Sequence, residues 1–200
     1  TLVENRLGIW VYGGSYNGFT QWAAAKRLHP ALKTIVPYCP NDPGFGLPMT
    51  NNVFLAANYA WAFYATNNKH LDDATYSDAK RWQDLPWNWY RSGRPYREID
   101  KVDGTPNPCL QRWLNHPDYD DYWQRMAVSG KEYAALDIPV LAIDGYYDDG
   151  QNNAVRRMQE HYRARPDAEH YLVIGPYGHG DVQSSRKAYE STKDSPDTSD

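Results

Sequence analysis

The chain has 200 residues, of which 41% are apolar, and a formal net charge of −4. This length suits one globular domain of ordinary size, and the apolar fraction is sufficient for a hydrophobic core. The Lys and Arg residues form no basic cluster of the kind that binds a phosphate backbone. No apolar stretch approaches the roughly 20 residues that span a bilayer. We therefore expect neither a nucleic-acid nor a membrane partner; the cellular compartment stays open.

Four short apolar segments have the length and composition of buried strands. They are rich in β-branched residues and lack clean alternation, which is typical of a parallel sheet covered on both faces. Helical patterns at 18–28 and 151–163 follow the first and the third of these segments. The alternation of strand and helix predicts an α/β fold. The predicted strands are 7–12, 32–38, 138–144 and 171–174.

A long insertion, rich in Trp, Tyr, Asn and Pro, separates the second and third predicted strands. A structureless loop of that length would be unusual in a compact domain, and helical patterns recur at 51–66, 72–85 and 117–128. The tail is polar and almost free of apolar residues. We therefore expect four segments: a first part of the core (1–39), a mostly helical cap (40–136), the rest of the core (137–180) and a polar tail or linker (181–200).

The motif Gly13-Gly14-Ser15-Tyr16-Asn17-Gly18 lies between the first predicted strand and a predicted helix. A nucleophilic serine needs such a strained turn at the carboxyl edge of a sheet, with small residues close by. The backbone N–H of Tyr16 would then donate to an oxyanion. A glycine-rich turn without any chemistry is the alternative, and the glycine comes one residue later than in the common G-x-S-x-G pattern.

A serine nucleophile needs a base and an orienting carboxylate, which in this fold follow in the order Ser, acid, His. Asp148 comes after the third predicted strand, and His179 comes after the fourth. Alternatively, Asp148 and Asp149 cap the next helix while His179 is a surface residue. A metal site of Asp148, Asp149 and His179 is a third reading, but no HxxxH or CxxC spacing favours it. We expect no metal and no cofactor.

Several linked motifs resemble the Xaa-Pro dipeptidyl-peptidase (S15) and cocaine-esterase-like (CocE/NonD) acyl hydrolases. In this family the strained turn that carries the nucleophilic serine, called the nucleophile elbow, has the pattern G-x-S-Y-x-G, and residues 13–18 match it. The resemblance extends from about residue 5 to residue 179. It implies part of an α/β-hydrolase fold, namely the C-terminal half of its sheet, with a helical cap. The matching segments are 5–8, 13–18, 19–22, 116–123, 145–148 and 174–179.

The resemblance implies that Ser15 is the nucleophile, Asp148 rather than Asp149 the acid, and His179 the base. The family's second oxyanion donor, a tyrosine, and its early strands precede the elbow by more residues than this chain has. We therefore expect a fragment of a longer protein. In this fragment strand 7–12 should lie at an exposed sheet edge, and the chain alone should fold poorly. Whether the full-length protein forms homo-oligomers stays open.

The expected function is hydrolysis of an ester or amide bond, of acyl-esterase or Xaa-Pro dipeptidyl-peptidase type, through an acyl-enzyme. The partner would be a small-molecule ester or a short peptide. An α-amino acid ester hydrolase or β-lactam acylase is the first alternative, although only Asp149 remains of the acidic cluster that such enzymes use. A non-catalytic ligand-binding module of the same fold is the second. Cys39 and Cys109 are read as two separate buried thiols or as a disulfide.

Overall fold

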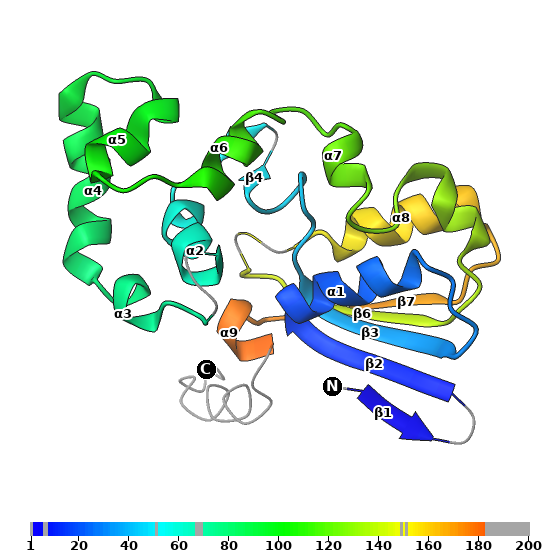
Figure 1. Cartoon of the computed structure of the whole chain (residues 1–200). Coiled ribbons are helices and arrows are strands. Elements are labelled where there is room, and N and C mark those ends of the chain that lie inside the picture. Colours follow the sequence, from blue (N-terminus) through cyan, green and yellow to red (C-terminus); the bar gives the residue numbers. More distant parts are fainter. Residues whose placement is uncertain are drawn as a thin grey trace, which may run out of the picture. The chain divides into compact units, whose positions relative to one another are not determined.

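The computed structural model of the chain is shown in Figure 1. Most of the tail expected at 181–200 lies outside the described residues. For the first strand, the structure describes the backbone alone. The described residues are 2–5, 8–50, 52–66, 70–148, 150 and 152–182.

The chain divides into two compact units, which we describe one at a time. The sheet unit comprises residues 1–47 and 121–200, and the helical unit comprises residues 48–120. The helical unit lies within the insertion expected at 40–136, whereas residues 121–136 belong to the sheet unit.

Within its described residues, the sheet unit has a five-stranded sheet in the order β1-β2-β3-β6-β7 (Figure 1). β1 is antiparallel to β2, and the other neighbouring strands are parallel. The connections between the parallel strands contain helices, which is the usual way to cross from one parallel strand to the next. The predicted α/β fold class is therefore confirmed. The strands are β1 (Leu2–Asn5), β2 (Gly8–Ser15), β3 (Leu32–Pro40), β6 (Val140–Gly145) and β7 (His170–Gly175).

The expectation that strand 7–12 forms an exposed sheet edge is wrong. β1 pairs with β2 from Leu2 opposite Val11 to Asn5 opposite Gly8, so β2 has a neighbour on each side. The prediction considered only the apolar segment itself. A hairpin needs few residues, and the four residues Leu2–Asn5 are enough to form an antiparallel partner.

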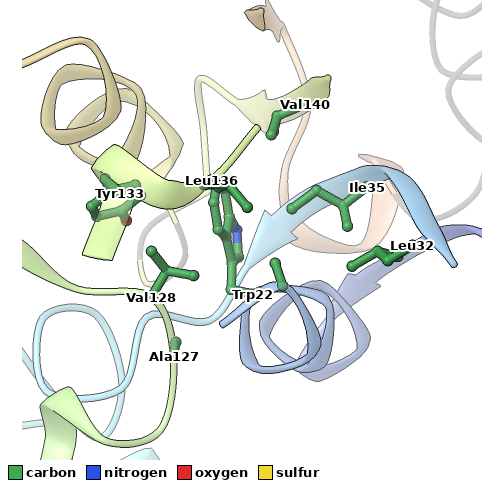
Figure 2. Packing of buried hydrophobic residues seen from close by; sticks show 9 residues of the cluster. Trp22, Leu32, Ile35, Ala127, Val128, Tyr133, Leu136 and Val140 are labelled. Atoms are coloured by element: carbon green, nitrogen blue, oxygen red, sulfur yellow. The ribbon is translucent and has the colours of Figure 1, made fainter. Parts of the chain in front are cut away.

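Two helices, α1 (Tyr16–Ala25) and α8 (Ala154–Ala164), lie on the same face of the sheet (Figure 1). Trp22 of α1 is fully buried and lies at the centre of the core beneath them (Figure 2). The core draws on α1, on the strands and on the segment before β6. Its buried residues are Trp22, Ala25, Leu32, Ile35, Ala127, Val128, Tyr133, Leu136 and Val140.

Three short helices complete the described part of the sheet unit. The helix predicted at 117–128 is much shorter than expected, because only α7 (Asp121–Gln124) is helical there. Ala127 and Val128 instead pack into the core, and the tertiary contacts of these apolar residues override the helical pattern. The other two are the 3₁₀ helix η2 (Gly130–Ala135) and α9 (His179–Val182).

A buried ion pair joins the segment after β3 to helix α8. The Arg157 guanidinium donates to Asp42 at 2.5 Å, and both side chains are 2% exposed or less. Arg156 also donates to Asp42, and Arg157 contacts the Tyr133 hydroxyl at 3.0 Å. A charge that is removed from water needs such a partner, so Asp42 and Arg157 depend on each other.

Asp42→Ala is expected to destabilise the sheet unit by about 3–5 kcal/mol, because it leaves the Arg157 charge buried without its carboxylate. Glu160→Ala is the control, since it breaks an exposed ion pair with Arg163 and should cost less than ~1 kcal/mol. Urea unfolding of the two variants measures both free energies. Equal losses would mean that Arg157 is adequately solvated without Asp42.

The helical unit contains a small hairpin and a second hydrophobic core. The helix predicted at 51–66 begins only at Ala57, because the residues before it form strands β4 (Met49–Thr50) and β5 (Val53–Phe54). The helices of the helical unit are α2 (Ala57–Thr66), α3 (Asp73–Tyr76), α4 (Ala79–Ser92), η1 (Tyr96–Glu98), α5 (Ile99–Asp103) and α6 (Pro108–Leu114). Its buried core residues are Tyr59, Phe63, Leu85, Ile99 and Leu110.

Local sequence fixes the ends of several of these helices. Asp78 accepts a hydrogen bond from the Arg81 N–H at the start of α4, and Gly93 ends that helix with φ 65°. Asn107 caps α6 in the same way as Asp78 caps α4. Within the described residues, none of the helices has the length and apolar character needed to cross a membrane.

Candidate active site

Ser15 lies at the junction of β2 and α1 in a strained backbone conformation, with φ 59° and ψ −126°. Glycines close by make this turn possible. A Cβ on Gly13 would lie 2.8 Å from Cβ of Asn17, and a Cβ on Gly18 would lie 2.9 Å from Cα of Pro40. Strain of this kind is typical of functional turns. The structure thus places Ser15 at the carboxyl end of a strand, in the turn that the motif predicts.

Two loops that start from neighbouring strands are held together by backbone hydrogen bonds. Gly145 and Gly175 are partners at the ends of β6 and β7. Beyond them, the Tyr146 N–H donates to the Gly175 carbonyl at 2.8 Å, and the Tyr147 N–H donates to the Tyr177 carbonyl at 3.0 Å. A Cβ on Gly145 would overlap the Tyr177 carbonyl oxygen, so only glycine permits this approach.

Gly145→Ala is expected to destabilise the sheet unit by about 1–3 kcal/mol, because the new methyl group meets backbone that has no room to move. It should also lower kcat/KM by about 10²-fold by displacing the two loops. Gly180→Ala is a matched control, since a Cβ at Gly180 meets no heavy atom within 4 Å. Thermal unfolding and ester hydrolysis measure the effects; similar values for both variants would contradict the steric argument.

The two loops and the elbow bring Ser15, Asp148 and His179 together. Nε2 of His179 lies 3.0 Å from Oγ of Ser15, and Nδ1 lies 2.7 Å from Oδ2 of Asp148. The other carboxylate oxygen of Asp148 accepts the Gly150 N–H at 3.2 Å. Asp148 is therefore oriented from both sides. The arrangement is a continuous chain from carboxylate through imidazole to hydroxyl.

Burial and hydrogen bonding set the electrostatics of this chain. The Asp148 side chain is 1% exposed, whereas that of His179 is 34% exposed. The hydrogen bond with Asp148, and next the contact with Cys39, raise the pKa of His179 above its ordinary value, although burial opposes this. An imidazolium is thus stabilised here, as a base that accepts a proton in a reaction requires.

Tyr16 is the first residue of α1, and the N–H groups in the first turn of a helix have no acceptor within the helix. The structure thus leaves the predicted oxyanion donor directly beside Ser15. The Tyr16 side chain is 53% exposed and contacts Phe19 edge to face. Asp149, the alternative acid and a member of the alternative metal set, lies outside the described residues.

Cys39 is a neighbour of this site that the sequence analysis did not assign to it. Its side chain is fully buried near the end of β3, and its sulfur lies 3.9 Å from the His179 carbonyl oxygen. Cys109 is a half-buried free thiol in α6, so the two cysteines form no disulfide. The position of Cys39 at the carboxyl end of a predicted strand was the available signal, because parallel strands end at one edge.

A sequence profile of the X-Pro dipeptidyl-peptidase (S15) family matches residues 6–181, which include all three site residues. The chain belongs to this family. The resemblance stated from the motifs is therefore confirmed. The match spans the elbow, the helical unit and both loops, so membership of the S15 family covers most of the chain.

Individual relatives share less than a quarter of their aligned residues with this chain. Cocaine esterase from Rhodococcus sp. (strain MB1 Bresler) is 23% identical over 184 residues, covering 87% of this chain and 31% of that protein. The structure of an α-amino acid ester hydrolase is 23% identical in sequence, with a TM-score of 0.63. The match covers 88% of this chain and 29% of the hydrolase chain. The structure of an aminopeptidase from a marine sediment archaeon, Thaumarchaeota archaeon, is 20% identical in sequence, with a TM-score of 0.64. The match covers 89% of this chain and 30% of the aminopeptidase chain.

These similarities support the fold, which is of α/β-hydrolase type. The chain spans less than a third of each of these three relatives. Their names also refer to different substrates: cocaine, an α-amino acid ester and a peptide. Similarity alone therefore selects no substrate for this S15-family chain.

Proposed function

We propose that this chain supplies the catalytic residues of a serine hydrolase that cleaves ester or amide bonds through an acyl-enzyme. The observation that carries the proposal is the hydrogen-bonded chain from Asp148 through His179 to Ser15, with separations of 2.7 and 3.0 Å. Both distances lie within the reach that general-base catalysis requires.

In the proposed mechanism, Ser15 Oγ attacks the substrate carbonyl while Nε2 of His179 accepts the hydroxyl proton. Asp148 keeps the other ring proton on Nδ1, which leaves Nε2 free to act as a base. The Tyr16 N–H stabilises the oxyanion, and His179 then returns its proton to the leaving group. Water repeats the sequence and releases the acyl group. Every proton in this cycle is transferred by residues of this chain.

The proposed substrates are a small-molecule ester or a short peptide. Two chromogenic substrates with comparable leaving groups, a p-nitrophenyl ester and an Xaa-Pro p-nitroanilide, separate esterase from dipeptidyl-peptidase activity. We expect hydrolysis of at least one, with product formed in proportion to protein concentration. Saturable binding of ligands of both classes without turnover would contradict the proposal, and would favour a binding module with the same fold.

A further inference from the structure

The thiol of Cys39 forms a three-residue cluster with the two partners of Ser15. Its sulfur, one oxygen of Asp148 and one ring nitrogen of His179 all lie within 4.8 Å of one another. Cys39 and Asp148 are buried, and the His179 side chain is 34% exposed, so His179 is the member of the cluster that solvent contacts. The proposed hydrolysis does not use Cys39, although its thiol lies next to the catalytic imidazole.

Thiolate, imidazole and carboxylate together are a ligand set that suits Zn²⁺. At the usual bond lengths, neighbouring ligand atoms around a tetrahedral Zn²⁺ lie about 3.4 Å apart. Nδ1 of His179 and Oδ2 of Asp148 are 2.7 Å apart. These two atoms would separate by about 0.7 Å (from 2.7 to about 3.4 Å). The sulfur would approach them from a separation of at most 4.8 Å. Side-chain movements of that size need no change of fold.

We propose that Cys39, Asp148 and His179 form an inhibitory Zn²⁺ site. On binding, the Cys39 thiol loses its proton to solvent, and the imidazole proton transfers from Nδ1 to Nε2. The metal binds the sulfur, Nδ1 and an Asp148 oxygen, and water fills the fourth position. Nε2 then carries a hydrogen toward Ser15 and cannot accept the hydroxyl proton. No electron is transferred, and removal of the metal reverses the inhibition.

Metal binding is tested independently of catalysis with Co²⁺, which gives a thiolate charge-transfer band in the near ultraviolet. The chain has only two cysteines, so Cys109→Ser is a matched control for Cys39→Ser. We expect the band in the unmodified protein, in Cys109→Ser and in Ser15→Ala, and its loss in Cys39→Ser and Cys39→Ala. The proposal is overturned if no band appears, or if the band persists in both Cys39 variants.

The inhibitory effect rests on the proposed function, because it is seen only in a protein that hydrolyses substrate. The quantity measured is the free Zn²⁺ concentration that halves the hydrolysis rate of each variant, relative to the rate of that variant without metal. Loss of an outer-shell partner of a metal ligand typically costs about 10-fold or more in metal affinity. Loss of a direct ligand in Cys39→Ser should therefore raise that concentration by at least about 10-fold, with little change in Cys109→Ser. Equal sensitivity of the two variants would overturn the site. A Cys39-dependent Co²⁺ band in a protein that hydrolyses nothing would support the metal site while contradicting the proposed hydrolase activity.

Discussion

Ser15→Ala is expected to lower kcat/KM for ester hydrolysis by about 10⁴-fold or more. The substitution removes the only protein atom that bonds to the substrate carbonyl carbon in the proposed mechanism. Because Ser15 already has φ 59°, alanine there needs no new backbone conformation, so the fold should persist. Steady-state rates with a p-nitrophenyl ester measure the loss, and thermal unfolding verifies that the variant is folded.

Ser92→Ala is a suitable control, since this exposed hydroxyl lies in the helical unit, donates to the Trp89 carbonyl and accepts the Arg94 N–H. It should leave kcat/KM within a factor of about two, as a surface substitution usually does. A Ser15→Ala protein with near-normal turnover would eliminate Ser15 as the nucleophile.

Asp148→Asn is expected to cost a similar factor, about 10⁴-fold in kcat. An amide NH₂ group at this position can donate to Nδ1 of His179, which leaves the ring proton on Nε2 and facing Ser15. The base is then in the wrong tautomer while the geometry of the site stays nearly unchanged. Asp167→Asn, at a side chain that is 79% exposed, is the control and should leave the rate unchanged.

The same substitution should also change the pH dependence. Hydrolysis requires neutral His179, so kcat/KM rises with pH through the pKa of this residue. Asp148, and next Cys39, raise that pKa above the ordinary value of about 6.5. Removing the Asp148 charge destabilises the imidazolium, and the midpoint of the profile should therefore move to lower pH. An unchanged midpoint would mean that His179 is not the titrating group.

The sheet was largely predictable from sequence because buried parallel strands are short, apolar and rich in β-branched residues. The segment predicted at 171–174 became β7 (His170–Gly175). The misses have physical causes. β1 is four residues long and depends on pairing with β2, and β4 and β5 have two residues each. Elements that short are determined by their partners more than by their own composition.

The proximity of Ser15, Asp148 and His179 was expected from motif and order, because each residue follows a strand and parallel strands end at one edge. Two features were not expected. Cys39 was read as a buried thiol or a disulfide partner, although it too follows a predicted strand. The Asp42–Arg157 pair was missed because nothing local links residues so far apart in the chain; their complementary charges become informative only once the fold brings them together.

The most direct test of the central claim is covalent labelling with a fluorophosphonate, which forms a stable adduct with an activated serine. Peptide mapping by mass spectrometry locates the adduct, and the remaining activity is measured in parallel. The proposed mechanism predicts one adduct per chain, on Ser15, with loss of activity in proportion to labelling and no labelling of His179→Ala. An active preparation that is inhibited through an adduct on another residue, or that is not labelled at Ser15 at all, would contradict it.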